Sequence, residues 1–101
     1  MFEINGETWY IQFSCPYHDI FIMDDGEYTI GVTDDNEKTI YLASNLRGKL
    51  LKKVLCHEIV HAAMFSYNVE LDYMEEELLA NIIATYGTEI LNIANDIFKR
   101  L

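Results

Sequence analysis

The stretch from Leu46 to about Tyr67 constrains the fold most, because its apolar residues recur at the three- and four-residue spacing of a helix. Ser44 and Asn45, just before it, are residue types that cap helix N-termini. Asn68, just after it, suits a left-handed helix stop. We therefore expect one amphipathic helix here, and its apolar face must pack against another element. The residues of that face are Leu50, Leu51, Val54, Leu55, Ile59, Ala62 and Phe65.

The residues ahead of this helix have the pattern of β-strands. Phe2–Ile4 and Glu7–Phe13 flank Asn5-Gly6, a dipeptide typical of two-residue hairpins. A second strand pair is predicted at Tyr28–Thr33 and Lys38–Ala43, on either side of a polar turn. The first half of the chain should therefore form a small sheet.

A second helix is expected to begin at Tyr73, because Asp72 and Glu75 have the spacing of a capping box. Apolar residues at helical spacing continue to the end of the chain. They are interrupted by Gly87, which costs about 1 kcal/mol relative to alanine inside a helix. With 101 residues and no linker or repeat, the chain should form one domain, residues 1–101. The expected fold class is α+β: a small antiparallel or mixed sheet followed by two packed helices.

The composition argues against several classes of function. The chain has 17 acidic and 7 basic residues and a net charge of −10, which repels phosphate backbones and argues against nucleic-acid binding. No apolar run approaches the roughly 20 residues of a membrane span, and the N-terminus lacks the pattern of a signal peptide. Cys15 and Cys56 form no disulfide framework. We therefore expect a cytoplasmic protein that binds neither nucleic acid nor membrane.

Basic residues gather near the start of the first predicted helix. They are Arg47, Lys49, Lys52 and Lys53. A solvated helix start is the simpler interpretation, and a docking patch for an acidic partner is the alternative.

A metal-binding motif lies in the same helix. His57 and His61 are four residues apart, which places both imidazoles on one helix face, where they can converge on a single ion. In H-E-x-x-H sites the glutamate, here Glu58, is the general base that activates water beside zinc. The chain has only three histidines, and two of them lie in this motif. A zinc site is therefore a better interpretation than a chance match.

A catalytic zinc site needs a third protein ligand. Three consecutive glutamates begin the second predicted helix, and Glu75 belongs to the capping box by its spacing. Glu77 begins a stripe of small and polar residues that continues through Asn81 and Ala84, which would let the helix approach a metal closely. We therefore predict Glu77 as the third ligand, with Glu76 as the alternative.

The order of helix, loop and helix with a downstream glutamate resembles the gluzincins, the thermolysin-like zinc peptidases. The segment Glu77-Leu78-Leu79-Ala80-Asn81 matches their pattern of Glu, two residues, a small residue, and Asp or Asn. The resemblance implies that Glu77 binds zinc and that Asn81 orients His57 from behind. It points to ImmA/IrrE-like peptidases and to the short gluzincins of phage and mobile elements, whose members would work in the host cytoplasm. Three segments look similar to small phage-encoded members: Tyr28–Asp34, Thr39–Tyr41 and Val54–Glu58.

Peptide hydrolysis also needs a donor for the developing oxyanion. The sequence offers Tyr67, Tyr73, Tyr17 and His18 and does not rank them. A strand near Tyr28–Thr33, if it lies at the sheet edge, could align a peptide beside the metal by strand addition.

The function predicted from the sequence is therefore that of a zinc metallopeptidase acting on an unidentified peptide or protein substrate. The alternative is a zinc-stabilised protein-interaction module without catalytic activity. Both hypotheses use the same zinc ligands, but only the peptidase needs Glu58 for its function.

Overall fold

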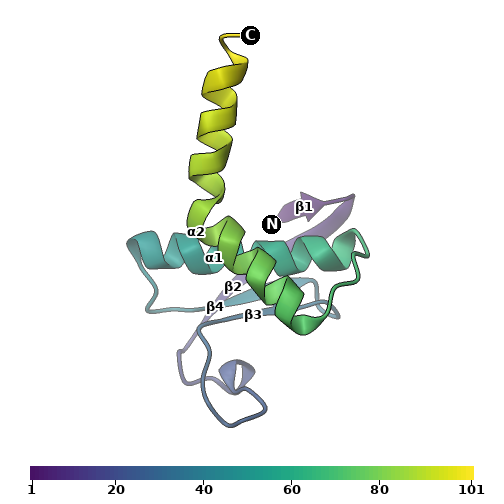
Figure 1. Cartoon of the computed structure of the whole chain (residues 1–101). Coiled ribbons are helices and arrows are strands. Elements are labelled where there is room, and N and C mark those ends of the chain that lie inside the picture. The colour runs from purple at the N-terminus through teal and green to yellow at the C-terminus, as the bar shows by residue number, and fades with distance from the viewer.

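The computed structural model describes residues 1–101 and confirms the α+β fold class. Its sheet has four strands in the order β1-β2-β4-β3, and two long helices follow (Figure 1). The elements are β1 (Phe2–Ile4), β2 (Glu7–Ser14), the 3₁₀ turn η1 (Asp19–Phe21), β3 (Gly31–Asp34), β4 (Thr39–Ala43), α1 (Gly48–Ser66) and α2 (Tyr73–Phe98).

The sheet is mixed because the two predicted strand pairs join through a parallel contact. β1 and β2 form the predicted hairpin, with Asn5 and Gly6 at φ 50° and 77°, as a tight two-residue turn requires. β2 runs parallel to β4, with Ile11 opposite Ile40, and β3 pairs antiparallel with the other side of β4. β3 therefore forms one edge of the sheet, with its outer side free of strand pairing.

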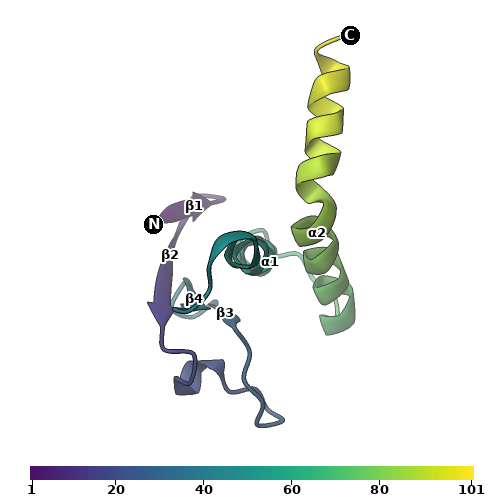
Figure 2. The same ribbon diagram turned by 90° about the vertical axis from the view of Figure 1, so that its left-hand side faces the viewer.

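Helix α1 lies between the sheet and α2, so the molecule has three layers (Figure 2). The core forms where α1 covers one face of the sheet. Trp9 is fully buried there, and its indole Nε1 donates a 2.7 Å hydrogen bond to Ser66 Oγ in the last turn of α1. The fully or almost fully buried apolar residues of this core are Trp9, Phe21, Ile40, Leu42, Ala43, Leu46 and Ala62.

Two predicted boundaries were wrong. Helix α1 begins at Gly48 and not at Leu46, and its first position is flanked by Arg47, which makes no side-chain capping bond. Ser44 and Asn45 lie in a turn after β4 and do not cap the helix, because Leu46 turns inward and is buried in the core. β3 begins three residues later than predicted, since residues 28–30 belong to the loop that leads into it.

The start of α2 agrees with the sequence pattern. Asn68 adopts the left-handed conformation, with φ 53°, and Asp72 and Glu75 form the capping box. Only the first part of α2 packs on α1, and the rest projects away from the body of the protein (Figure 1). Among its residues only Ala80 is buried. Neither long helix is apolar enough over sufficient length to cross a membrane.

The bond between Trp9 and Ser66 yields a stability prediction. Ser66→Ala leaves the indole N–H of Trp9 buried without a partner, which should lower the free energy of unfolding by about 1–3 kcal/mol. Thermal unfolding would show this as a lower melting temperature. Ser44→Ala, the same change at an exposed serine, is the control and should have almost no effect. Equal melting temperatures for the two variants would contradict the assigned role of this bond.

Candidate metal centre

Two helices bring the candidate metal ligands together. The four-residue spacing in α1 places His57 and His61 side by side, with their Nε2 atoms 3.1 Å apart. The second turn of α2 places Glu77 across from them. Its two carboxylate oxygens lie 2.8 Å from His61 Nε2 and 3.4 Å from His57 Nε2. One ligand atom from each of these three residues lies within 4.8 Å of the others, so the group could hold a metal ion.

Glu76, the residue before Glu77, contacts the other ring nitrogen of His61 and not the Nε2 atom that faces Glu77. Glu76 Oε1 lies 2.9 Å from His61 Nδ1, on the opposite side of the ring from Nε2. A hydrogen bond at Nδ1 fixes the ring orientation and leaves Nε2 free for a metal, as second partners of metal-binding histidines do. Glu76, the alternative ligand from the sequence, is therefore placed to orient His61.

Asn81, which the gluzincin resemblance places behind His57, lies farther along α2. Its side chain is exposed and makes no hydrogen bond to His57 in this structure. It lines a smaller cavity of about 330 Å³ together with His57 and Glu77. The orienting role implied by the resemblance stays a prediction, and the only orienting contact present is the one made by Glu76.

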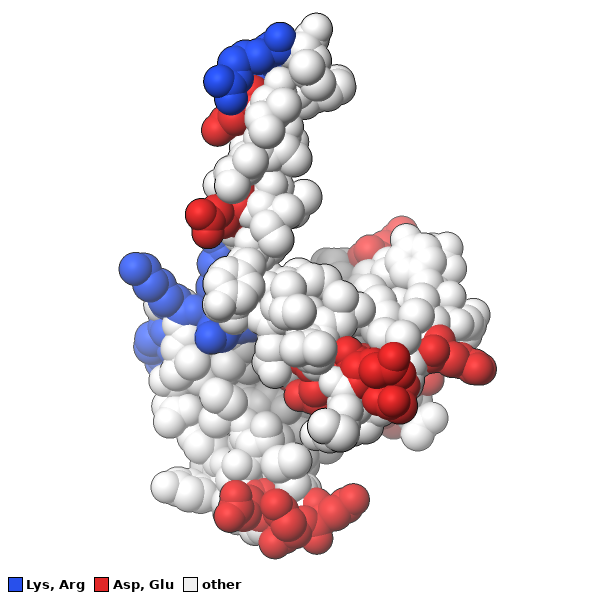
Figure 3. Space-filling view, viewed as in Figure 1, with Lys and Arg blue, Asp and Glu red and all other residues white.

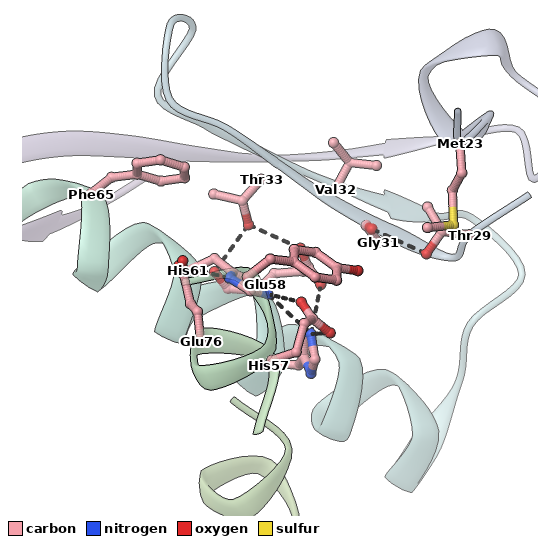
Figure 4. Close-up of a pocket in the computed structure, with 12 residues that line it drawn as sticks. Met23, Thr29, Gly31, Val32, Thr33, His57, Glu58, His61, Phe65 and Glu76 are labelled. Carbon is pink, nitrogen blue, oxygen red and sulfur yellow. Dashed lines mark hydrogen bonds and ion pairs between the residues drawn. The ribbon is translucent and has the colours of Figure 1, made fainter. Parts of the chain in front are cut away.

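Glu58 is buried, although it is an ionisable residue of a type that usually lies on the surface. Only 7% of its surface is exposed, and its Oε2 lies 3.9 Å from His57 Nε2. The hydroxyl of Thr33 on β3 lies 3.0 Å from Glu58 Oε1 and 3.0 Å from its backbone oxygen, and can donate to either (Figure 4). Burial raises the pKa of the Glu58 carboxyl, whereas the Thr33 hydrogen bond and the two histidines oppose that rise.

β3 lies unusually close to this glutamate. A Cβ atom on Gly31 would come within 3.0 Å of Glu58 Cγ and 2.9 Å of Val54 Cγ1. Only glycine therefore lets the strand approach α1 at this point without displacing a side chain. Sequence reasoning missed both Gly31 and Thr33, because their contacts with Glu58 join strand to helix and leave no local pattern.

An open cavity of about 390 Å³ lies over the cluster (Figure 4). Its walls come from β3, α1, the first turn of α2 and Met23 of the loop before β3. Of the four candidate oxyanion donors, only Tyr73 lines it. Tyr17 and Tyr67 are exposed elsewhere, and His18 Nδ1 accepts a hydrogen bond from Ile20 N at the start of η1.

The charges of the cluster favour a cation. Three carboxylates, those of Glu58, Glu76 and Glu77, gather around two imidazoles, and no lysine or arginine pairs with them. Carboxylates so close together repel one another unless positive charge is added. A bound divalent ion would supply that charge at the point where the Nε2 atoms and the Glu77 oxygens converge.

Comparison with known proteins gives no match to a family model, to a curated protein or to a solved structure. The resemblance to gluzincins therefore rests on the motif residues of the sequence alone, and the structure adds a possible metal-binding triad, His57, His61 and Glu77.

The burial of Glu58 yields a prediction for the metal-free protein. Because the folded-state pKa is raised, the native state binds the proton more tightly, and stability falls as the pH rises from the unfolded-state pKa through the folded-state value. Glu58→Gln removes the buried charge and keeps an oxygen that can accept from Thr33. It should raise the melting temperature at mildly alkaline pH. This gain should shrink as the pH falls towards the ordinary glutamate pKa of about 4.3.

The control for this experiment is Glu70→Gln, the same change at an exposed glutamate that makes no ion pair. It should leave the melting temperature unchanged at both pH values. A gain for Glu58→Gln that does not depend on pH would show that burial of charge is not its cause.

The three consecutive glutamates yield a second prediction from this site. Glu77→Gln should weaken metal binding most, because a neutral amide replaces a ligand. Glu76→Gln should weaken it by about tenfold, since the charge behind His61 is lost. Glu75→Gln should have no effect, because glutamine also completes a capping box. Titration with zinc against a competing chelator measures all three. Equal affinities for the Glu75 and Glu77 variants would show that the metal is bound elsewhere.

Proposed function

We propose that this protein is a zinc-dependent metallopeptidase that hydrolyses peptide bonds in a protein substrate. One observation carries the proposal: a buried carboxylate, Glu58, borders a group of three potential metal ligands without belonging to it. A purely structural zinc site is closed by four protein ligands and has no need of such a residue. An open cavity beside the cluster leaves room for a substrate.

The ligand atoms suit a tetrahedral zinc ion. At zinc–nitrogen and zinc–oxygen distances of about 2.0–2.1 Å, tetrahedral ligand atoms are about 3.3 Å apart. The corresponding separations here run from 2.8 to 3.4 Å. His57, His61 and Glu77 would hold the ion. Zinc in such a site supplies Lewis acidity, which makes water acidic near neutral pH and polarises a carbonyl group.

Glu58 would perform the proton transfers. Its carboxylate accepts a proton from the attacking water and then donates it to the amine of the departing peptide. The hydrogen bond from Thr33 holds the carboxylate in place and favours its ionised form, the form that can act as a base. Tyr73, the one candidate donor that lines the cavity, would bind the developing oxyanion.

The free edge of β3 offers a way to hold the substrate. β3 is the outermost strand on its side of the sheet, and Gly31, Val32 and Thr33 line the cavity. An extended peptide could add to this edge by backbone hydrogen bonds, which would lay its scissile bond beside the histidines. Apolar side chains of the peptide would meet Met23 and Phe65 in the cavity wall.

Glu58→Gln tests the enzymatic role directly. The variant should still bind about one zinc per chain, because Glu58 is not among the three grouped ligands. Its rate of peptide cleavage should fall by roughly 10²–10⁴-fold, since the amide does not accept the proton. Elemental analysis and cleavage of a peptide library, with the wild-type protein alongside, measure the two effects.

Glu70→Gln is again the matched control and should cleave as the wild type does. If the wild-type protein binds zinc and cleaves no peptide, while Glu58→Gln keeps every biological effect, the peptidase proposal fails. The zinc-stabilised interaction module would then be the better account.

A further inference from the structure

The outer half of α2 exposes apolar side chains that no other element of the chain covers. Past its first turns the helix leaves α1 behind, and its C-terminal part stands clear of the body (Figures 1 and 2). Its large apolar side chains are between 38% and 95% exposed. They are Ile82, Ile83, Tyr86, Ile90, Leu91, Ile93, Ile97, Phe98 and, just after the helix, Leu101.

Five of these residues recur at a spacing that suits a second helix. Ile83, Tyr86, Ile90, Ile93 and Ile97 are separated by three, four, three and four residues. This is the heptad pattern of a coiled coil, in which the first and fourth positions of each heptad face the partner. We call these five residues the α2 seam. Its first position is isoleucine in each heptad, which suits a two-stranded parallel coiled coil, whereas isoleucine at the fourth position as well, as at Ile93, also suits three or four strands.

We propose that two copies of this chain pair through the α2 seam as a parallel two-stranded coiled coil. The flanks of the seam support a second copy in parallel orientation. Glu89 and Asp96 lie on one flank, whereas Gly87 and Ala94 lie on the other. In a parallel pair each flank meets the opposite flank of the partner, so Glu89 faces a small residue. In an antiparallel pair like flanks meet, and the acids would repel one another.

Gly87 is a second observation in favour of a close partner. A glycine inside a helix costs about 1 kcal/mol relative to alanine. A Cβ at this position would meet only Ile83 of the same helix, at 3.3 Å, and no atom of another element within 4 Å. Packing against the other elements of the chain therefore gives no reason for a glycine here. A second helix lying against the seam would use the space that the missing side chain leaves.

The exposed area of the seam and its flanks approaches that of a stable pair. A half-exposed large side chain offers on the order of 100 Å², so the five seam residues offer roughly 500 Å². Ile82 and Leu101, one on each flank, bring the total towards the roughly 800 Å² that each partner buries in a stable interface. The seam also lies clear of the acidic patches on the body. Figure 3 shows the charged residues of the tip, including basic ones, at the far end of the helix.

Light scattering of the full chain tests the pairing. At about 100 µM, a concentration at which even a weak micromolar dimer is filled, the wild type should have twice the chain mass of 11.8 kDa. The double variant Ile90→Glu and Ile97→Glu, which places charges within the seam, should weaken dimerisation by at least about 100-fold and appear as a monomer. Thr88→Glu and Asn95→Glu add the same charges at the same spacing on the opposite face, and this control should remain a dimer.

A wild-type monomer at that concentration would overturn the proposal, and so would a dimer that tolerates both pairs of substitutions equally. Zinc binding distinguishes a variant that no longer pairs from one that no longer folds, because the potential metal ligands lie outside the outer half of α2. The seam variant should bind zinc as the wild type does. The dimer does not depend on the proposed peptidase activity, so either proposal can fail alone.

Disulfide cross-linking gives a second measurement that does not disturb the seam charge. In a background with Cys15→Ser and Cys56→Ser, Ile90→Cys should form a covalent dimer on mild oxidation, because equivalent seam positions face each other in a parallel pair. Asn95→Cys, on the opposite face, should not. Equal cross-linking at the two positions would contradict a parallel seam.

Discussion

The close approach of β3 to α1 at Gly31 is the contact on which the site depends. A Cβ atom added to Gly31 would lie within 3.0 Å of side-chain atoms of Glu58 and Val54. As a result Thr33, two residues along the same strand, reaches the Glu58 carboxylate. Without this approach Glu58 would lie on an exposed helix face and would behave as an ordinary surface glutamate. The sheet therefore contributes the environment of Glu58, whereas the helices contribute the potential metal ligands.

Those parts of the fold and site that depend on local chemistry could be predicted from the sequence. The hairpin at Asn5 and Gly6, the left-handed Asn68 and the capping box of α2 are each fixed by a few neighbouring residues, and all are present. The pairing of His57 with His61 follows from helix geometry in the same way. Glu77 could be chosen because small and polar residues follow it at helical spacing.

The parts that were missed depend on contacts between distant segments. Thr33 and Glu58 are 25 residues apart, and no periodicity links a strand hydroxyl to a helix carboxylate. The start of α1 was misplaced because burial of Leu46 outweighs the capping preference of Ser44 and Asn45. The role of Glu76 depends on the angle at which α2 crosses α1. That angle lets two consecutive glutamates reach opposite nitrogens of His61.

The potential metal ligands lie close to one another in the sequence, whereas the residues that surround Glu58 come from distant segments. His57, His61 and Glu77 all fall within two helices joined by the short segment 67–72. Contacts between such neighbours close early in folding, whereas contacts between strands and distant helices close late. In a refolding chain the α1–α2 hairpin would therefore bring its potential metal ligands together before the sheet docks. Its Glu58 would stay hydrated until β3 docks, so the order of assembly would delay any water-activating capacity until the whole domain is formed.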